Sequence, residues 1–299
     1  MEEEIQKFLK KYEYNYSKIT SEKSLKLIYE LLINNIHFEP ETDIEYLYYG
    51  VYYRTWEKSW EKALPSYQKA ADLNNSTAMN NIGCYYETVE KSWEKTLPWY
   101  QKAADLNNST GMYNIGGYYE TVEKSWEKAL PWYQKAADLN NLDAMNNLGF
   151  YYQSVEKSWE KALPLFQKAA NLNYSYSMNF LGCYYETVEK SWEKALSWYQ
   201  KAADLNNSYA IKKLANYYLN VENNPEKALE TFMLNEEENK NYILDLLKNN
   251  PELSYKIYLK QRRLEKENLK LKSKVVHYKY RPKGFLNAEN HFNNLSKTS

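Results

Sequence analysis

A tryptophan recurs every 33 residues through the middle of this 299-residue chain, and each one opens a nearly identical segment. The five positions are Trp60, Trp93, Trp126, Trp159 and Trp192. A fixed period of this length is typical of solenoids, which grow by stacking similar layers and not by enlarging a single core. The repeat therefore predicts a stacked array of short units.

Each repeat contains two stretches in which apolar residues follow the spacing of a helix. The first covers about residues 76–89 in one clear copy, with Ser76 or Thr77 as the expected N-cap. The second covers about residues 59–73, with Ser59 as the expected N-cap. The positions expected to be buried are Met79, Ile82, Gly83, Tyr86 and Val89 in the first stretch, and Trp60, Ala63, Leu64, Tyr67, Ala70 and Ala71 in the second. Two alternating helices of this kind predict an all-α fold of helix-turn-helix repeats.

Glycine, proline and asparagine recur at positions that predict how the helices of the repeat pack, bend and end. Gly83 costs its helix about 1 kcal/mol relative to alanine, and its recurrence predicts that a neighbouring helix approaches closely. Its equivalents are Gly50, Gly116, Gly149 and Gly182. Pro65, which recurs as Pro98, Pro131 and Pro164, predicts a bend or a displaced first turn, because proline removes a helical hydrogen bond. Asn74-Asn75 predicts a helix end with one left-handed residue.

The repeats do not extend through the whole chain. We expect an N-terminal helical cap over residues 1–42, the repeat array over residues 43–234, C-terminal helices over residues 235–274 and a disordered basic tail over residues 275–299. Pro251 is well placed to open a long C-terminal helix. Ile257, Leu264 and Leu271 in it are seven residues apart, a weak heptad that leaves two alternatives open. The helix either pairs with a second copy of the chain or folds back on the array.

Charge and cysteine usage restrict the environment of the protein. Lys+Arg and Asp+Glu both number 39, so the chain has no net charge, but residues 260–299 carry +8 and residues 1–259 carry −8. The two cysteines, Cys84 and Cys183, occupy the same position in different repeats, too far apart for a disulfide. The first residues do not resemble a signal peptide, and no apolar run reaches the ~20 residues of a membrane span. We therefore expect a cytoplasmic protein, in the host cytoplasm if the source is a virus.

Residue patterns that carry catalysis or bind metals do not occur in the sequence. The three histidines have no cysteine or histidine at metal-ligand spacing. Glycine-rich phosphate loops and nucleophile motifs are also missing. We expect no enzyme activity, no metal and no cofactor.

Two segments of one repeat carry a resemblance to a known family. Residues 144–152 read Ala-Met-Asn-Asn-Leu-Gly-Phe-Tyr-Tyr, and residues 161–170 read Lys-Ala-Leu-Pro-Leu-Phe-Gln-Lys-Ala-Ala. This pattern resembles the Sel1-like repeat, a relative of the tetratricopeptide repeat, over roughly residues 43–234. The turn inside the repeat departs from the family pattern, because it reads Glu-Thr-Val-Glu-Lys-Ser in three of the copies and is shorter than usual. The resemblance implies a right-handed α-solenoid that serves as a protein-binding scaffold.

Analogy with tetratricopeptide arrays implies that the first helix of each repeat lines a concave binding face. Three rows of positions lie off the predicted core stripe on these helices. The rows are Asn80, Tyr113, Asn146 and Asn179; Cys84, Gly117, Phe150 and Cys183; and Glu87, Glu120, Gln153 and Glu186. They would suit an extended polar or basic peptide, although the same residues could also be ordinary exposed or half-packed positions.

The leading functional hypothesis is therefore a scaffold or adaptor that holds a partner protein or peptide, with possible self-association through the C-terminal helix. The alternative is a nucleic-acid-associated protein that uses the basic residues 272–283, because cations pair with phosphates and aromatic rings stack on bases. We do not favour nucleic acid, since the repeat array is acidic, and we expect no membrane partner.

Overall fold

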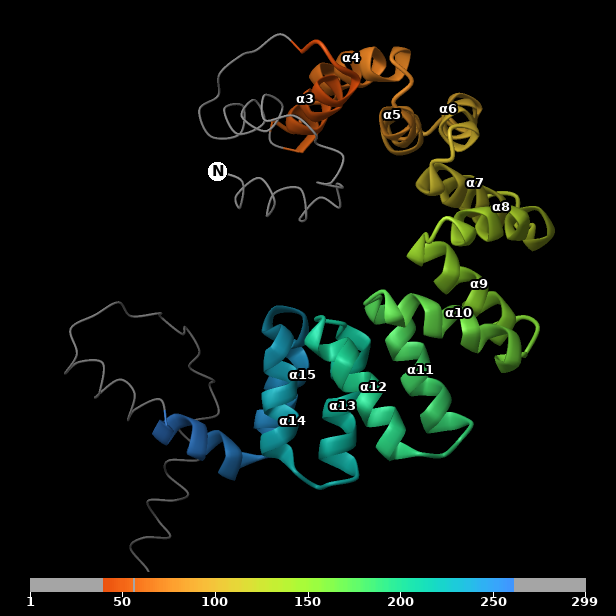
Figure 1. The fold of residues 1–299 in the computed structure, drawn as a ribbon. Coiled ribbons are helices and arrows are strands. Elements are labelled where there is room, and N and C mark those ends of the chain that lie inside the picture. Colours follow the sequence, from red (N-terminus) through yellow and green to blue (C-terminus); the bar gives the residue numbers. More distant parts are fainter. Residues whose placement is uncertain (1–39, 56, 261–299) are drawn as a thin grey trace, which may run out of the picture. The chain divides into compact units, whose positions relative to one another are not determined.

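The computed structural model describes residues 40–55 and 57–260, and every regular element in these ranges is a helix (Figure 1). The helices are α3 (Asp43–Thr55), α4 (Trp60–Asp72), α5 (Ser76–Thr88), α6 (Trp93–Asp105), α7 (Ser109–Thr121), α8 (Trp126–Asp138), α9 (Leu142–Ser154), α10 (Trp159–Asn171), α11 (Ser175–Thr187), α12 (Trp192–Asp204), α13 (Ser208–Asn220), α14 (Pro225–Phe232), the short 3₁₀ helix η3 (Met233–Asn235) and α15 (Glu236–Asn249). Residues 251–260 are also helical. The predicted tail over residues 275–299 lies outside the described residues, as does the predicted cap over residues 1–42 except for its last three residues.

Consecutive helices pack in pairs, so that a first helix and a second helix form one repeat. Among the described residues, those up to Leu165 form one compact body, in which α3 packs on α4, α5 on α6 and α7 on α8, and each pair contacts the next. The residues from Phe166 to Lys260 form another, in which α11 packs on α12 and α13 on α14. The helices α3 to α13 all have 13 residues. Together with the period of 33 residues, this pairing confirms the all-α solenoid of helix-turn-helix repeats.

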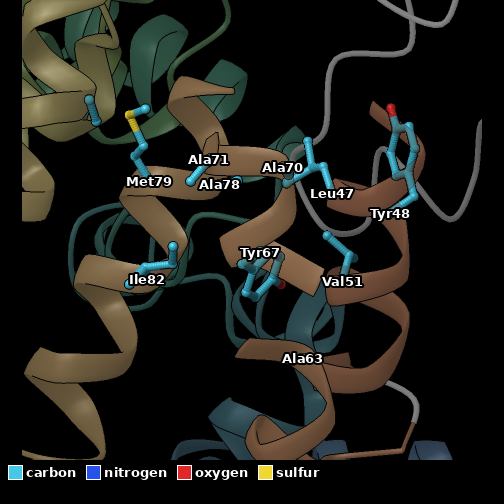
Figure 2. Packing of buried hydrophobic residues seen from close by; sticks show 11 residues of the cluster. Leu47, Tyr48, Val51, Ala63, Tyr67, Ala70, Ala71, Ala78, Met79 and Ile82 are labelled. Atoms are coloured by element: carbon cyan, nitrogen blue, oxygen red, sulfur yellow. The ribbon is translucent and has the colours of Figure 1, made fainter. Parts of the chain in front are cut away.

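Small residues of the second helices surround one large buried ring in each repeat. In α4, Ala63, Tyr67 and Ala70 are fully buried. Figure 2 shows them with Val51 of α3 and Ile82 of α5, which belong to the same buried cluster. Alanine lets the helix backbones approach, and the ring fills the space that remains. Each repeat therefore buries its apolar surface against its neighbours, which is the main source of its stability.

The repeated glycine of each first helix faces the buried ring of its own second helix. A Cβ atom at Gly116 would lie 2.7 Å from Cδ1 of Tyr133, and one at Gly83 would lie 2.5 Å from Cδ1 of Tyr100. Real Cβ atoms do not approach other atoms this closely, so a larger residue would push the two helices apart. The predicted close approach is confirmed, and this packing offsets the cost of about 1 kcal/mol that glycine carries in a helix.

Asparagine is the N-cap of α5, α7, α9 and α13, whereas Tyr174 takes this position before α11. The Oδ1 atom of Asn75 accepts a hydrogen bond from the N–H of Ala78 at 2.9 Å, which makes Asn75 the N-cap of α5. The expectation of Ser76 or Thr77 at this place is therefore wrong. The amide group of Asn75 also donates to Oδ2 of Asp43 in the preceding first helix, α3, at 2.9 Å. One asparagine thus begins its own helix and ties it to the previous repeat, which a serine hydroxyl is too short to do.

The second helices end as the sequence predicts. Asn74 is left-handed, with a φ of 63°. The N–H of Asn75 donates to the carbonyl of Ala70 at 3.0 Å, and the N–H of Asn74 donates to the carbonyl of Ala71 at 2.9 Å. These two hydrogen bonds are the Schellman arrangement, which satisfies carbonyl groups that the helix end would leave exposed. The same left-handed conformation recurs at Asn107, Asn140, Asn173 and Asn206.

Three expectations about packing differ from the structure. Val89 was expected in the core but is 47% exposed, because it is the C-cap residue of α5. Trp60 is only half-buried, with its ring centroid 5.4 Å from that of Tyr85. Pro65 lies within an uninterrupted α4, and α12, which has Ser197 at this position, is equally long. The proline therefore does not separate the first turn from the rest of its helix, and a bend at Pro65 stays a prediction.

The turn inside each repeat has its own recurring geometry. Lys91 is left-handed, with a φ of 53°, and the next lysine along the chain, Lys95, pairs with Glu90 at 2.6 Å. The Nζ atom of Lys95 also lies 5.5 Å from the ring centroid of Tyr86. Because the lysine is exposed, solvent screens the ion pair, which therefore adds little to stability. The arrangement fixes the shape of the turn more than it stabilises the fold.

Candidate partner-binding face

The candidate site consists of the three predicted rows on α5, α7, α9 and α11, which we call the first-helix face. In the first row, Asn80 is buried, and its Oδ1 accepts a hydrogen bond from Nδ2 of Asn114 in α7 at 2.9 Å. This side chain therefore takes part in the contact between two repeats. Tyr113 is half-buried, and its ring centroid lies 5.6 Å from that of Tyr133. Burial, followed by the negative charge of Asp143, raises the pKa of Tyr113.

The remaining members of the first row are both half-buried. They are Asn146 in α9 and Asn179 in α11. The Oδ1 atom of Asn179 is buried and accepts no hydrogen bond within the part of the chain that the structure describes. The first row is thus partly engaged in packing between repeats and partly accessible.

The second row varies most in side-chain size. Cys84 is half-buried, and its Sγ atom lies 3.4 Å from the hydroxyl oxygen of Tyr100, while Sγ of Cys183 lies at the same distance from the hydroxyl oxygen of Tyr199. Burial raises the pKa of the Cys84 thiol, and both cysteines are free thiols. Phe150 is 42% exposed. The row therefore offers thiols, an exposed ring and, at Gly117, no side chain at all.

The buried tyrosines of the second helices donate hydrogen bonds to carboxylates of the third row. Tyr100 donates its hydroxyl hydrogen bond to Glu87, and Tyr133 donates to Glu120. Tyr199 donates to Oε2 of Glu186 at 2.5 Å. These glutamates are half-buried, so one face of each carboxylate stays accessible. Because the donor is rigid and packed in the core, the carboxylates are fixed in orientation.

The electrostatics of these tyrosines explain why they act as donors. Burial is the largest cause that raises the pKa of Tyr133, and its hydrogen bond to Glu120 raises it further. Burial also raises the pKa of Tyr100, with Cys84 as the next cause. The raised pKa values keep the hydroxyl groups of Tyr100 and Tyr133 protonated near neutral pH, where they can donate.

Gln153, the remaining member of the third row, is half-buried and belongs to a paired exchange that the sequence analysis missed. In the repeat in which glutamate is replaced by Gln153, the tyrosine of the second helix is replaced by Phe166. A phenylalanine has no hydroxyl group to donate to a carboxylate, so the two replacements belong together. The tyrosine partners of the site could have been found from this paired exchange.

An ion pair with the next repeat completes the Glu186 site. The Nζ atom of Lys213, in α13, lies 2.9 Å from Oε2 and 3.2 Å from Oε1 of Glu186. Both side chains are partly shielded from solvent. The carboxylate of this row can therefore accept a tyrosine hydroxyl and an ammonium group at the same time.

Apart from the first-helix face, an open apolar depression of about 580 Å³ lies between α4 and α5. Its walls include Trp60, Leu64, Pro65, Tyr85 and Val89. The sequence reasoning placed Trp60, Leu64 and Val89 in the core and so did not anticipate this surface. Within the described ranges, no group of three or more His, Cys, Asp or Glu residues could hold a metal ion. No helix there is sufficiently long and apolar for a transmembrane segment.

Comparison with known proteins gives a consistent result. The family model of the Sel1 repeat matches residues 76–108, 109–141, 142–174 and 175–207. Each segment begins at the first residue of a first helix and contains one helix pair. No curated protein matches the chain.

Several solved structures have a similar fold. A Sel1 repeat protein from Oxalobacter formigenes is 26% identical, with a TM-score of 0.57, over 64% of this chain and 84% of that protein. A protective antigen of uropathogenic Escherichia coli strains, which displays an SLR fold, is 22% identical, with a TM-score of 0.60, over 87% of this chain and 65% of the antigen. An immunity protein from Pseudomonas aeruginosa is 24% identical, with a TM-score of 0.51, over 73% of this chain and 86% of that protein.

Proposed function

Because four consecutive Sel1 repeats over residues 76–207 make this chain a Sel1 repeat protein, we propose that it is a non-enzymatic scaffold that binds a protein partner on its first-helix face. Repeat arrays of this kind bind through extended surfaces to which each repeat contributes a few side chains. The partner would be a protein or an extended peptide with polar and basic side chains, because acceptor groups predominate in the accessible part of the face. No metal or cofactor takes part in such binding.

The main support for the proposal is that hydrogen bonds fix the orientation of the Glu87 and Glu120 carboxylates. Each carboxylate accepts a hydrogen bond from a core tyrosine, so little conformational entropy is lost when a partner binds it. Sites whose first contacts are supported by packed residues bind more tightly than sites on mobile side chains. Half-burial also strengthens a charge interaction relative to one in bulk water.

Two other hypotheses gain no support from the described residues. The nucleic-acid alternative depends on residues 272–283, which lie outside them. The same holds for Leu264 and Leu271, on which self-association through the C-terminal helix depends. Self-association stays a prediction, and no comparison favours nucleic acid.

The proposal is tested by a pull-down from cell lysate with tagged full-length protein. The variant Glu87→Gln with Glu120→Gln removes two charges from the first-helix face. The matched control, Glu94→Gln with Glu127→Gln, removes the same two charges from exposed positions on the second helices α6 and α8. We expect the first variant to lose partners that the wild type and the control retain. Equal retention by all three proteins, with unchanged circular dichroism, would place the partner on another surface.

A further inference from the structure

Glu186 shows how a carboxylate of the third row binds a lysine side chain. The Nζ atom of Lys213 lies 2.9 Å from Oε2 and 3.2 Å from Oε1, while the hydroxyl of Tyr199 donates to Oε2. Tyr199 is fully buried, so the donor that orients the carboxylate is itself fixed by packing. A carboxylate oriented in this way accepts an ammonium group through a charge-assisted hydrogen bond.

Glu87 and Glu120 have the same arrangement without the lysine. Each accepts a hydrogen bond on Oε2 from a buried tyrosine, which is Tyr100 or Tyr133. Within the ranges that the structure describes, neither carboxylate forms an ion pair, and Oε1 of each accepts no hydrogen bond. Both carboxylates therefore have an accepting atom that the described residues leave unused.

Asparagine takes the place of Lys213 beside both carboxylates. The equivalent residues are Asn114 and Asn147. Asn114 donates to Oδ1 of Asn80 at 2.9 Å, so its amide group takes part in the contact between two first helices. Asparagine is uncharged and much shorter than lysine, so it does not replace the ammonium group. The cation has to come from a partner.

Space for the cation is most evident beside Glu120. A Cβ atom built on Gly117, one turn before Glu120, would meet only the hydroxyl oxygen of Tyr133, at 3.9 Å. In α5 the equivalent position carries Cys84, whose Sγ atom lies 3.4 Å from the hydroxyl oxygen of Tyr100. The missing side chain in α7 leaves room beside the Tyr133–Glu120 pair for a long, narrow side chain such as lysine.

The two carboxylates lie at the same position of neighbouring helices in one compact body. The helices α5 and α7 are in direct contact, since Asn108 donates to Oγ of Ser76 at 3.3 Å. Packed helices have axes about 8–10 Å apart. Residues three apart in a polyproline II chain lie on the same side and about 9 Å apart, whereas residues two apart in a β-strand are only about 7 Å apart. The spacing of the helices therefore matches a polyproline II peptide.

We propose that Glu87 and Glu120 bind two lysine side chains of a partner peptide, three residues apart in a polyproline II conformation. The inference rests on the proposed use of the first-helix face, and it adds the chemistry and the spacing that this face recognises. At each carboxylate the partner provides the ammonium group that Lys213 provides at Glu186. Raising the salt concentration weakens the contact, because the carboxylates are only partly shielded from solvent.

Fluorescence anisotropy with labelled synthetic peptides and the full-length protein tests the proposal. The probe contains Lys-Pro-Pro-Lys between neutral residues, and the control peptide has four prolines between the same two lysines, which places them about 15 Å apart. We expect the wild type to bind the probe about tenfold more tightly than the control peptide. The variant Glu87→Gln with Glu120→Gln should lose this preference, whereas Glu94→Gln with Glu127→Gln should keep it.

The variant Asn147→Lys tests the same contact from within the chain. Its lysine should bind Glu120 as Lys213 binds Glu186, and it should lower the affinity for the probe to that for the control peptide. The proposal is overturned if the wild type binds both peptides equally, or if the preference survives the loss of the two glutamates. Partner loss in the pull-down would still support the general function in that case, so the two failures can be told apart.

Discussion

At the scale of single residues, two neighbouring glycines of α7 test how closely the helices pack. A methyl group at Gly116 would collide with the buried ring of Tyr133, whereas one at Gly117 would meet only its hydroxyl, at 3.9 Å. We expect Gly116→Ala to destabilise the protein by about 1–3 kcal/mol. Gly117→Ala should be neutral or stabilise it by up to about 1 kcal/mol, because alanine favours the helix. Urea unfolding followed by circular dichroism measures both, and equal shifts of the two midpoints would contradict the packing role of Gly116.

Helical spacing predicts the burial of the repeated tyrosine but not the hydrogen-bond partner of its hydroxyl group. Helical spacing predicts that Tyr67 and its equivalents face the core, and Tyr100, Tyr133 and Tyr199 do so. Spacing alone does not show that the hydroxyl reaches a glutamate on the other helix, because that pairing depends on how the two helices cross. Only the joint exchange to Gln153 and Phe166 points to it.

At the scale of helices, the left-handed asparagine after each second helix supports a second prediction. Asn140 has a φ of 61°, and its N–H donates to the carbonyl of Ala137 at 2.9 Å. Asn140→Ala should cost about 1–2 kcal/mol, because a Cβ atom without a local polar group disfavours this conformation. Asn140→Gly is the control and should be nearly neutral, because glycine adopts positive φ freely. Urea midpoints measure the difference; an equal loss in both variants would mean that the side chain matters and the conformation does not.

Helix positions were largely predictable, and their exact ends were less so. The spacing of apolar residues identified both helices of the repeat, and Ser59 accepts the expected N-cap hydrogen bond, from Lys62 at 3.3 Å. The first helix begins after Asn75 because this residue contacts the previous repeat as well as its own helix, and a contact between repeats is not visible in the pattern of one repeat. The exposure of Val89 has a similar cause, since the position fits the helical stripe but lies after the last helical turn.

At the scale of the whole molecule, the fold was predictable and the contacts that the first-helix side chains make were not, for one physical reason. Each repeat contacts mainly its neighbours, so a recurring pattern is enough to specify the packing. The contacts of the first-helix face change instead where the copies differ, as at Gly117, Gln153 and Lys213. Whether Glu186 has a lysine partner and Glu120 does not is decided by one residue in the following repeat. Such differences become meaningful only when the contacts between repeats are known.

Because each repeat contacts mainly its neighbours, we expect that one complete repeat can be removed without unfolding the rest. Deletion of residues 109–141 removes α7 and α8 and joins α6 to α9. At the new junction Ala144 takes the place of Gly111, where a Cβ atom would lie 2.9 Å from that of Ala103. A shift of a few tenths of an ångström is enough to accommodate it, since alanine already occupies this position in α5 and α9. We expect unchanged helicity per residue and a smaller dependence of unfolding on urea, measured by circular dichroism. Deletion of residues 109–121 is the control: it removes α7 alone, leaves α8 without its first helix and should abolish cooperative unfolding. Loss of helicity in the complete-repeat deletion would show that the repeats are not interchangeable layers.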